Sequence, residues 1–417
     1  MSAATSRGPL RALLSANAVS VLGSSMTLLA LPWFVLATTG SAGRTGLVAA
    51  CEGVGLGVSS LLGSPLVNRL GARRTAVLSD LLAAAGVGTV PLLHGAGLLQ
   101  LWLLCLLVGL VGLVAAPGIT ARYVLAPRLV ELAGVRVERA MSMYDGVSRG
   151  ARMLGAPLAG LLIALLGPAD VLVVDAVTFL VSAALIRGCV PDLAGEPPED
   201  SGYVASLRAG VALLRSDRLL LGITVMVCVT NLLDAAWAAV LLPVYAREVL
   251  DSSVAMGTLV GLFGLGALTG TALYGWTGHR LPRWPVFTVA FLVCGPPRLF
   301  GLAVDLPFGW LVVMALVTGL ACGAINPVLT VVELERVPDS RRAAFFGVAA
   351  AGSVAGMPLG AFVAGLAVEH VGLHPALFLA GFLYLVATLS PLVWAGRWRE
   401  MDQQPVGARL VGATMGA

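Results

Sequence analysis

The sequence contains little charge and no lysine. Of its 417 residues 12% are charged, against roughly 25% in ordinary soluble proteins. This shortage excludes a soluble domain, which needs a charged surface, and a disordered chain, which is rich in charge. Six cysteines, scattered singly, exclude a disulfide scaffold. The net charge of +4 is too small to indicate a nucleic-acid partner.

Apolar residues make up 58% of the chain and recur in continuous runs long enough to span a bilayer as helices, about 20 residues each. The runs are not the short alternating strands of a β-barrel. We therefore predict an all-α polytopic membrane protein with twelve transmembrane helices. Their approximate spans are 12–38, 45–67, 75–94, 98–121, 140–166, 170–187, 219–246, 254–278, 285–304, 309–332, 343–368 and 375–396.

One longer polar stretch divides the spans into two sets of six. We predict a six-helix bundle over residues 1–188, a cytoplasmic linker over 189–218 and a second six-helix bundle over 219–417. Within the linker, apolar residues recur at helical spacing, which predicts an interfacial amphipathic helix. These residues are Val204, Leu207, Val211 and Leu214.

The arginines predict the orientation. With the N-terminus in the cytoplasm, 21 of the 26 arginines fall on the inner side and two, Arg44 and Arg247, on the outer side. This bias is typical of membrane proteins. We therefore expect both termini to be cytoplasmic. The first span is too long for the apolar region of a cleaved signal peptide.

An ionisable group within a span is costly and is a functional candidate, and two acidic residues stand out. Glu52 lies in the outer half of the second span, and no neighbour in sequence neutralises it. Asp234 lies midway along the seventh span, nine residues before Pro243. Both are candidates for proton coupling, and an ion pair between helices is the structural alternative for Glu52.

Three charges share one face of the fifth span. Asp145, Arg149 and Arg152 are spaced i, i+4 and i+7. We expect Asp145 to pair with Arg149 and Arg152 to seek a partner, for which Glu52 is a candidate. Two interpretations remain open: an internal salt-bridge network, and a gate or binding site for anionic groups of a substrate. The two are compatible, because transporters exchange such ion pairs when they change state.

Other polar residues within spans have simpler interpretations. Asn17, Asn231 and Asn326 are candidate substrate or gating residues, although a hydrogen bond between helices is favoured for each. Asn326 precedes Pro327, which suggests a hinge. For Arg298 we expect snorkelling to the outer interface, and for Asp80 and Asp175 structural pairing.

The two halves repeat each other weakly. Gly155-Ala156-Pro157-Leu158 matches Gly356-Met357-Pro358-Leu359, and such duplication places a cavity between the halves near mid-membrane. GxxxG pairs, which favour close helix packing, occur in the second, eighth and eleventh spans at Gly53/Gly57, Gly266/Gly270, Gly352/Gly356 and Gly356/Gly360.

These residues resemble the major facilitator superfamily, and in particular its drug-efflux branch of macrolide and siderophore exporters. The stretch 63–74 resembles the superfamily's loop signature between spans two and three, and 150–160 is similar to its antiporter signature. The resemblance implies a conformational latch in the loop, with Asn68 where the family has Asp. The usual acid of the first span is also replaced, by Ser24. The latch candidates are Asn68, Arg69, Gly71, Arg73, Arg74 and Asp80, and we expect Asp80 to pair with Arg73.

The resemblance implies a secondary active transporter of the inner (plasma) membrane, not an enzyme. We expect proton-coupled efflux of a hydrophobic or amphipathic small molecule, such as a drug or secondary metabolite, by alternating access. Solute uptake and lipid or lysolipid flipping by the same fold are the alternatives. The expected partners are the substrate, protons and the bilayer. The sequence has no Walker motif and no metal-binding motif, so we expect no ATP, metal or cofactor, and a monomer.

Overall fold

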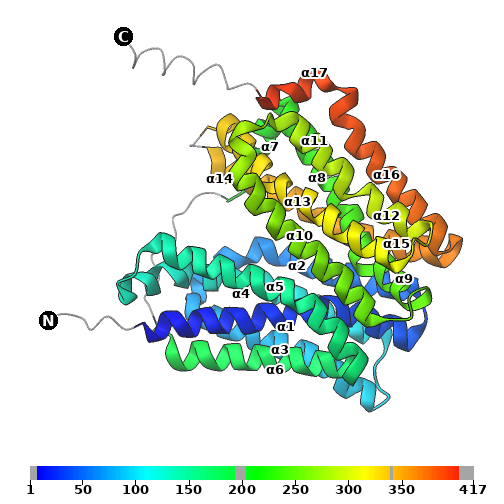
Figure 1. The fold of residues 1–417 in the computed structure, drawn as a ribbon. Helices are drawn as coiled ribbons and strands as arrows, with labels where there is room; N and C mark the ends of the chain where they lie inside the picture. The colour runs from blue at the N-terminus through cyan, green and yellow to red at the C-terminus, as the bar shows by residue number, and fades with distance from the viewer. Residues whose placement is uncertain (1–6, 193–202, 339–340, 403–417) are drawn as a thin grey trace, which may run out of the picture. The chain divides into compact units, whose positions relative to one another are not determined.

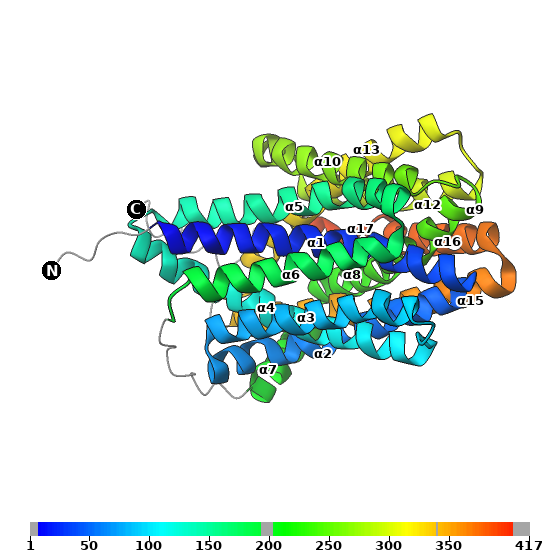
Figure 2. The same ribbon diagram turned by 90° about the horizontal axis from the view of Figure 1, so that it is seen from below.

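Long helices make up the first half of the chain. The computed structural model describes residues 7–192, 203–338 and 341–402, and these contain no strand. Six helices follow one another up to residue 189 and run alongside each other in both views (Figures 1 and 2). They are α1 (Gly8–Thr39), α2 (Ala42–Leu70), α3 (Ala72–Gly95), α4 (Leu101–Ala133), α5 (Val137–Leu166) and α6 (Pro168–Cys189).

The second half is also helical, but several of its long helices are interrupted. The linker holds a short helix, α7 (Tyr203–Ser216), and the described residues end in a short α-helix and a 3₁₀ turn. The elements that follow α7 are α8 (Arg218–Ala236), the π-helix η1 (Trp237–Leu241), α9 (Leu242–Glu248), α10 (Ser253–Thr277), η2 (Gly278–Arg280), α11 (Arg283–Cys294), α12 (Pro296–Ala303), α13 (Phe308–Arg336), α14 (Arg342–Ala355), α15 (Met357–Val371), α16 (Leu373–Val393), α17 (Ala395–Trp398) and η4 (Arg399–Asp402).

The observed helices confirm the predicted fold class. Among the described residues, eleven helices, some of them interrupted, are long and apolar enough to cross a membrane. The predicted span 45–67 corresponds to α2, which is 29 residues long. The predicted linker helix is present as α7. At Asn326-Pro327, where we predict a hinge, α13 continues through Pro327.

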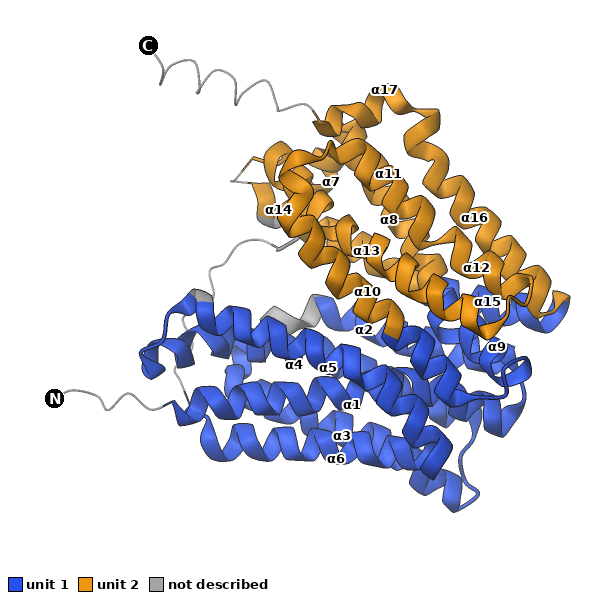
Figure 3. Cartoon of the chain, viewed as in Figure 1, with its two compact units in different colours: residues 1–199, 235–261, 358–370 blue, residues 200–234, 262–357, 371–417 orange. Residues whose placement is uncertain are grey.

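The chain forms two compact units, shown in Figure 3. Unit 1 comprises residues 1–199, 235–261 and 358–370, and unit 2 comprises 200–234, 262–357 and 371–417. The boundaries therefore differ from the three predicted segments: parts of the seventh, eighth and eleventh spans belong to unit 1. In unit 1 the pairs α2/α4, α1/α6, α3/α4 and α3/α6 pack most extensively.

Two boundaries between the units coincide with helix interruptions. The first follows Asp234, just before the π-helix η1. Pro243 explains η1, because it cannot donate a hydrogen bond to Ala239 four residues earlier and its ring crowds that carbonyl. The second lies between Met357 and Pro358, where α14 gives way to α15. Pro358 therefore marks a point at which a long helix changes unit, whereas Pro243 lies nine residues beyond the first boundary.

Candidate functional site

The ion pair of Asp234 and Arg298 lies inside unit 2. Asp234 lies near the end of α8, and Arg298 lies in the first turn of α12, behind the break at Gly295-Pro296. The guanidinium donates to Oδ1 of Asp234. The Arg298 side chain is 7% exposed and that of Asp234 is 39% exposed. The acid is thus the accessible member of the pair.

Aromatic rings complete the environment of Arg298. Its guanidinium carbon lies 5.5 Å from the ring centroid of Phe263 and 5.8 Å from that of Tyr384, within the range of cation–π attraction. The prediction that Arg298 snorkels to the interface is wrong. An anion and two aromatic faces satisfy its charge inside the unit, so the side chain has no need to reach water.

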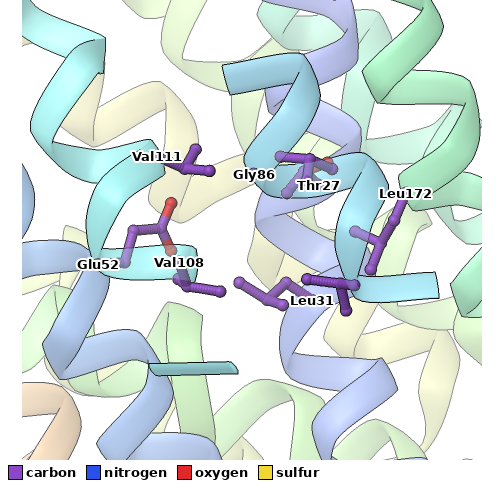
Figure 4. A pocket seen from close by; sticks show the side chains of 9 residues that line it. Thr27, Leu31, Glu52, Gly86, Val108, Val111 and Leu172 are labelled. Atoms are coloured by element: carbon purple, nitrogen blue, oxygen red, sulfur yellow. The ribbon is translucent and has the colours of Figure 1, made fainter. Parts of the chain in front are cut away.

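Glu52 lines a small cavity in unit 1 (Figure 4). The cavity has a volume of about 10 Å³, room for about one water molecule. Apolar residues form most of its wall, and Thr27 is the other polar side chain. Among the described residues, Glu52 makes no recorded ion pair or hydrogen bond. The full lining is Thr27, Leu31, Glu52, Gly86, Val87, Val90, Val108, Val111 and Leu172.

The charges of α5 do not form the predicted network. Asp145, Arg149 and Arg152 are all exposed. In the part of the chain that the structure describes, no ion pair joins Asp145 to Arg149, or Arg152 to Glu52. The i, i+4 spacing places side chains on one face, but exposed charges gain little from pairing. The three residues therefore remain candidates for gating or for substrate charge.

Asp80 pairs with Arg122 rather than with Arg73. Their side chains are 2% and 5% exposed. The Arg122 guanidinium donates to Oδ1 of Asp80 and to the hydroxyl of Ser20 at 3.0 Å. Ser182 donates to Oδ2 of Asp80 at 2.7 Å. The predicted pairing with Arg73 is wrong, because α4 extends beyond the predicted span and carries Arg122 into the bundle.

The other latch candidates lie at the ends of α2 and α3. Arg73 donates to the backbone carbonyl of Arg187, and Arg74 lies 3.7 Å from Asp192 in an exposed ion pair. Asn68 and Arg69 are exposed. Gly71 joins the two helices with φ +82°, a backbone conformation that favours glycine. This backbone conformation explains why a glycine occupies this position of the loop signature.

Two of the three asparagines make the expected bonds between helices. Asn17 in α1 is buried, and its Nδ2 donates to Ser148 Oγ in α5 at 2.7 Å. Asn231 in α8 donates to the carbonyl of Ser353 in α14 at 3.2 Å. Asn326 is exposed. The first two therefore contribute to packing within their own units.

Glycines allow α5 and α10 to touch within unit 1. A Cβ on Gly160 would lie 2.5 Å from the carbonyl oxygen of Ser253 and 3.1 Å from Cα of Gly257. Ser253 Oγ also donates to the Gly160 carbonyl at 2.9 Å. Of the predicted GxxxG pairs, Gly266 and Gly270 approach the backbone of α13, whereas Gly57 meets nothing within 4 Å.

Replacing Gly160 by Ala should destabilise this contact. The added methyl group overlaps backbone atoms, which cannot move aside as a flexible side chain can, so we expect a loss of about 1–3 kcal/mol. The measurement is thermal unfolding in detergent. Gly150→Ala in the same helix is the matched control, because a Cβ there meets nothing within 4 Å. Equal midpoints for the two variants would contradict the packing argument.

Sequence reasoning undervalued three buried charges: Arg122, Arg298 and Asp175. The sequence places Arg122 just after the fourth predicted span and predicts an interfacial position for Arg298 and structural pairing for Asp175. All three are buried. Asp175 accepts a hydrogen bond from Thr27 Oγ1 at 2.5 Å. For Arg298 and Asp175 the available signal is their position inside apolar runs, and the partners of all three residues depend on which helices lie side by side.

Comparisons with known proteins agree on the kind of molecule. The sequence is 28% identical to the multidrug efflux pump Tap of Mycobacterium tuberculosis H37Rv, over 96% of both chains. It is also 28% identical to Tap of Mycolicibacterium fortuitum, over 95% of this chain and 98% of that one.

Solved transporter structures share the fold. A mutant of the nucleoside transporter NupG superposes with a TM-score of 0.78 at 14% identity, covering 92% of this chain and 99% of that one. A POT family transporter in complex with 5-aminolevulinic acid gives a TM-score of 0.71 at 11% identity, covering 93% and 96%. The sequence itself matches the Major Facilitator Superfamily over residues 13–295 and 229–410. The chain is thus a multi-pass membrane transporter, not an enzyme, and belongs to the Major Facilitator Superfamily.

Proposed function

We propose that this chain exports a hydrophobic or amphipathic small molecule in exchange for protons, by alternating access. The efflux direction is supported by the similarity to Tap over nearly the whole of both chains. In this proposal two six-helix bundles, residues 1–188 and 219–417, are joined by the linker 189–218 and bind substrate between them.

The observation that carries the proposal is the ion pair of Asp234 and Arg298. Protonation of Asp234 removes the negative charge that holds the guanidinium, so the pair weakens when a proton arrives. Burial makes the difference large, because a buried charge that loses its partner is costly. Asp234 is the exposed member and so the one that a proton reaches. Binding of a proton by Asp234 is thereby linked to a change in the packing around Arg298.

The remaining candidates have supporting roles in this proposal. Asp145, Arg149 and Arg152 are exposed along α5 and would act in gating or meet charged groups of a substrate. Glu52 lines a cavity inside unit 1, so we assign it to proton transfer rather than to substrate binding.

We further propose the plasma membrane as location, with both termini in the cytoplasm. The support is the arginine bias of the sequence. A monomer contains both bundles and so is sufficient for alternating access. The proton gradient replaces ATP as the energy source, in keeping with the lack of a Walker motif in the sequence.

The test is the accumulation of ethidium, an amphipathic cation, in cells with and without the protein. We expect lower accumulation in expressing cells, and a rise to the level of the empty-vector control when a protonophore collapses the proton gradient. Equal accumulation in expressing and control cells over a panel of amphipathic compounds would contradict export. Export that persists after the gradient is collapsed would contradict proton coupling.

A further inference from the structure

Asp175 is a membrane-buried carboxyl group that the proposed mechanism does not use. It lies in α6 and is 1% exposed. Thr27 Oγ1 of α1 donates to its Oδ2 at 2.5 Å, and Thr178 Oγ1 lies 3.0 Å from its Oδ1. No arginine or histidine pairs with it among the described residues. Two threonine hydroxyls are therefore its hydrogen-bonding partners.

The hydrogen bonds of Thr178 fit a protonated acid. A hydroxyl has one proton and two acceptor lone pairs. Thr178 Oγ1 lies 2.7 Å from the backbone carbonyl of Asp175, which can only accept. With its proton donated there, Oγ1 faces Oδ1 as an acceptor. The 3.0 Å contact is then a hydrogen bond only if Oδ1 carries a proton, while Oδ2 accepts from Thr27.

The surrounding charges favour the same state. The charged groups that act on Asp175 are Glu52 of α2 and Asp80 of α3, both acidic. The charge of Asp80 is already matched by Arg122. An ionised carboxylate buried without a cation is costly. The neutral acid avoids that cost.

The approach of α1 to this carboxyl group depends on a glycine. A Cβ on Gly23 would overlap Oδ1 of Asp175 and Oγ1 of Thr178. Gly23 lies one helical turn before Thr27, on the same face of α1. The face formed by Gly23 and Thr27 thus brings the Thr27 hydroxyl to Asp175, and it leaves no room for a larger side chain at position 23.

Thr27 also connects Asp175 to the cavity that holds Glu52. Thr27 and Glu52 both line this cavity, whose volume of about 10 Å³ suits one water molecule. Figure 4 shows Thr27 and Glu52 on different sides of it. A water in the cavity would join the Glu52 carboxyl to the Thr27 hydroxyl, which already contacts Asp175.

We infer that Asp175 is a second proton-binding site, which exchanges its proton with Glu52 through the Thr27 hydroxyl and a water in the cavity. The transfer is a relay to the ionised form of Asp175: Glu52 releases a proton to the water, the water passes one of its protons to Thr27 Oγ1, and the hydroxyl proton of Thr27 passes to Oδ2 of Asp175. Rotation of the carboxyl group then presents this proton to Thr178. No other bond changes. The inference rests on proton-coupled export and adds to it a site in unit 1, separate from Asp234 in unit 2.

The first test is infrared spectroscopy of the reconstituted full-length protein at neutral pH. The carbonyl band of a protonated carboxylic acid is expected in the wild type and should decrease in Asp175→Asn. Asp170→Asn is the matched control, because Asp170 lies in the first turn of the same helix and is exposed. In deuterated water the band should shift more slowly in Thr27→Val, which lacks the hydroxyl. An unchanged band in Asp175→Asn would overturn the inference.

The second test counts protons per ethidium molecule in proteoliposomes, from the pH gradient that just balances an ethidium gradient. We expect the ratio to fall by one proton in Asp175→Asn and to stay unchanged in Asp170→Asn. A ratio of zero in the wild type would refute proton coupling itself. A ratio above zero that Asp175→Asn leaves unchanged would refute only the second site. If Asp175→Asn does not fold, Thr27→Val replaces it, because this variant keeps the carboxyl group but lacks the relay hydroxyl. The same fall in the ratio is then expected, and an unchanged ratio would again refute the second site.

Discussion

Asp80→Asn is expected to lower the free energy of unfolding by about 3–5 kcal/mol, the usual cost of breaking a buried ion pair by removing one partner. Both side chains of the pair are almost fully buried. The variant leaves the Arg122 guanidinium in the bundle without a counter-charge, and the Ser20 hydroxyl cannot replace one. Thermal unfolding in detergent, followed by the loss of helical circular dichroism, measures the effect.

Two controls separate burial from charge. Arg74→Gln removes an ion pair whose side chains are 72% and 49% exposed, and exposed pairs contribute about 0–1 kcal/mol. Asp80→Asn combined with Arg122→Met should recover most of the loss, because no unpaired charge then remains. Equal effects of Asp80→Asn and Arg74→Gln would contradict this account of the bundle.

Asp234→Asn is expected to abolish proton-driven export while the exchange of ethidium across the membrane persists. The amide imitates the protonated acid, so the pair with Arg298 is held in its weakened state and no proton can be taken up or released. The measurement compares two modes in proteoliposomes: accumulation driven by a pH gradient, and ethidium counterflow, which requires no net proton movement. Asp170→Asn, which changes an exposed acid in the first turn of α6, is the comparison variant.

The two modes also separate coupling from folding. Loss of both driven accumulation and counterflow in Asp234→Asn would indicate a structural role for the pair and contradict its assignment to coupling. Driven accumulation at the level of the wild type would contradict it as well. Only selective loss of the driven mode agrees with the account.

Much of the fold was predictable, because a helix that spans a bilayer leaves a long apolar run. Each predicted span corresponds to a long helix or to two or three consecutive helical elements. The failures have a common cause. An arginine that ends an apolar run looks like a loop residue, yet α4 continues through Arg122. The length of α4 alone does not show what Arg122 contacts, because its partner, Asp80, lies in another helix, α3.

The candidate site was less predictable than the fold. Asp234 and Glu52 stood out because charge inside an apolar run is rare, and both lie within the helices of their units. What each residue contacts was not predictable. Asp234 is paired with an arginine 64 positions away, and Glu52 faces a cavity formed by four other helices. These contacts depend on how the helices pack, which cannot be predicted from a single sequence.

The central claim, that export is coupled to protons, is tested most directly by the pH inside proteoliposomes that contain the wild-type protein and a pH-sensitive dye. Imposing an ethidium gradient without a pH gradient should drive protons across the membrane in the direction opposite to ethidium, and Asp234→Asn should abolish this change of pH. Ethidium movement through the wild-type protein with no change of internal pH would contradict the account.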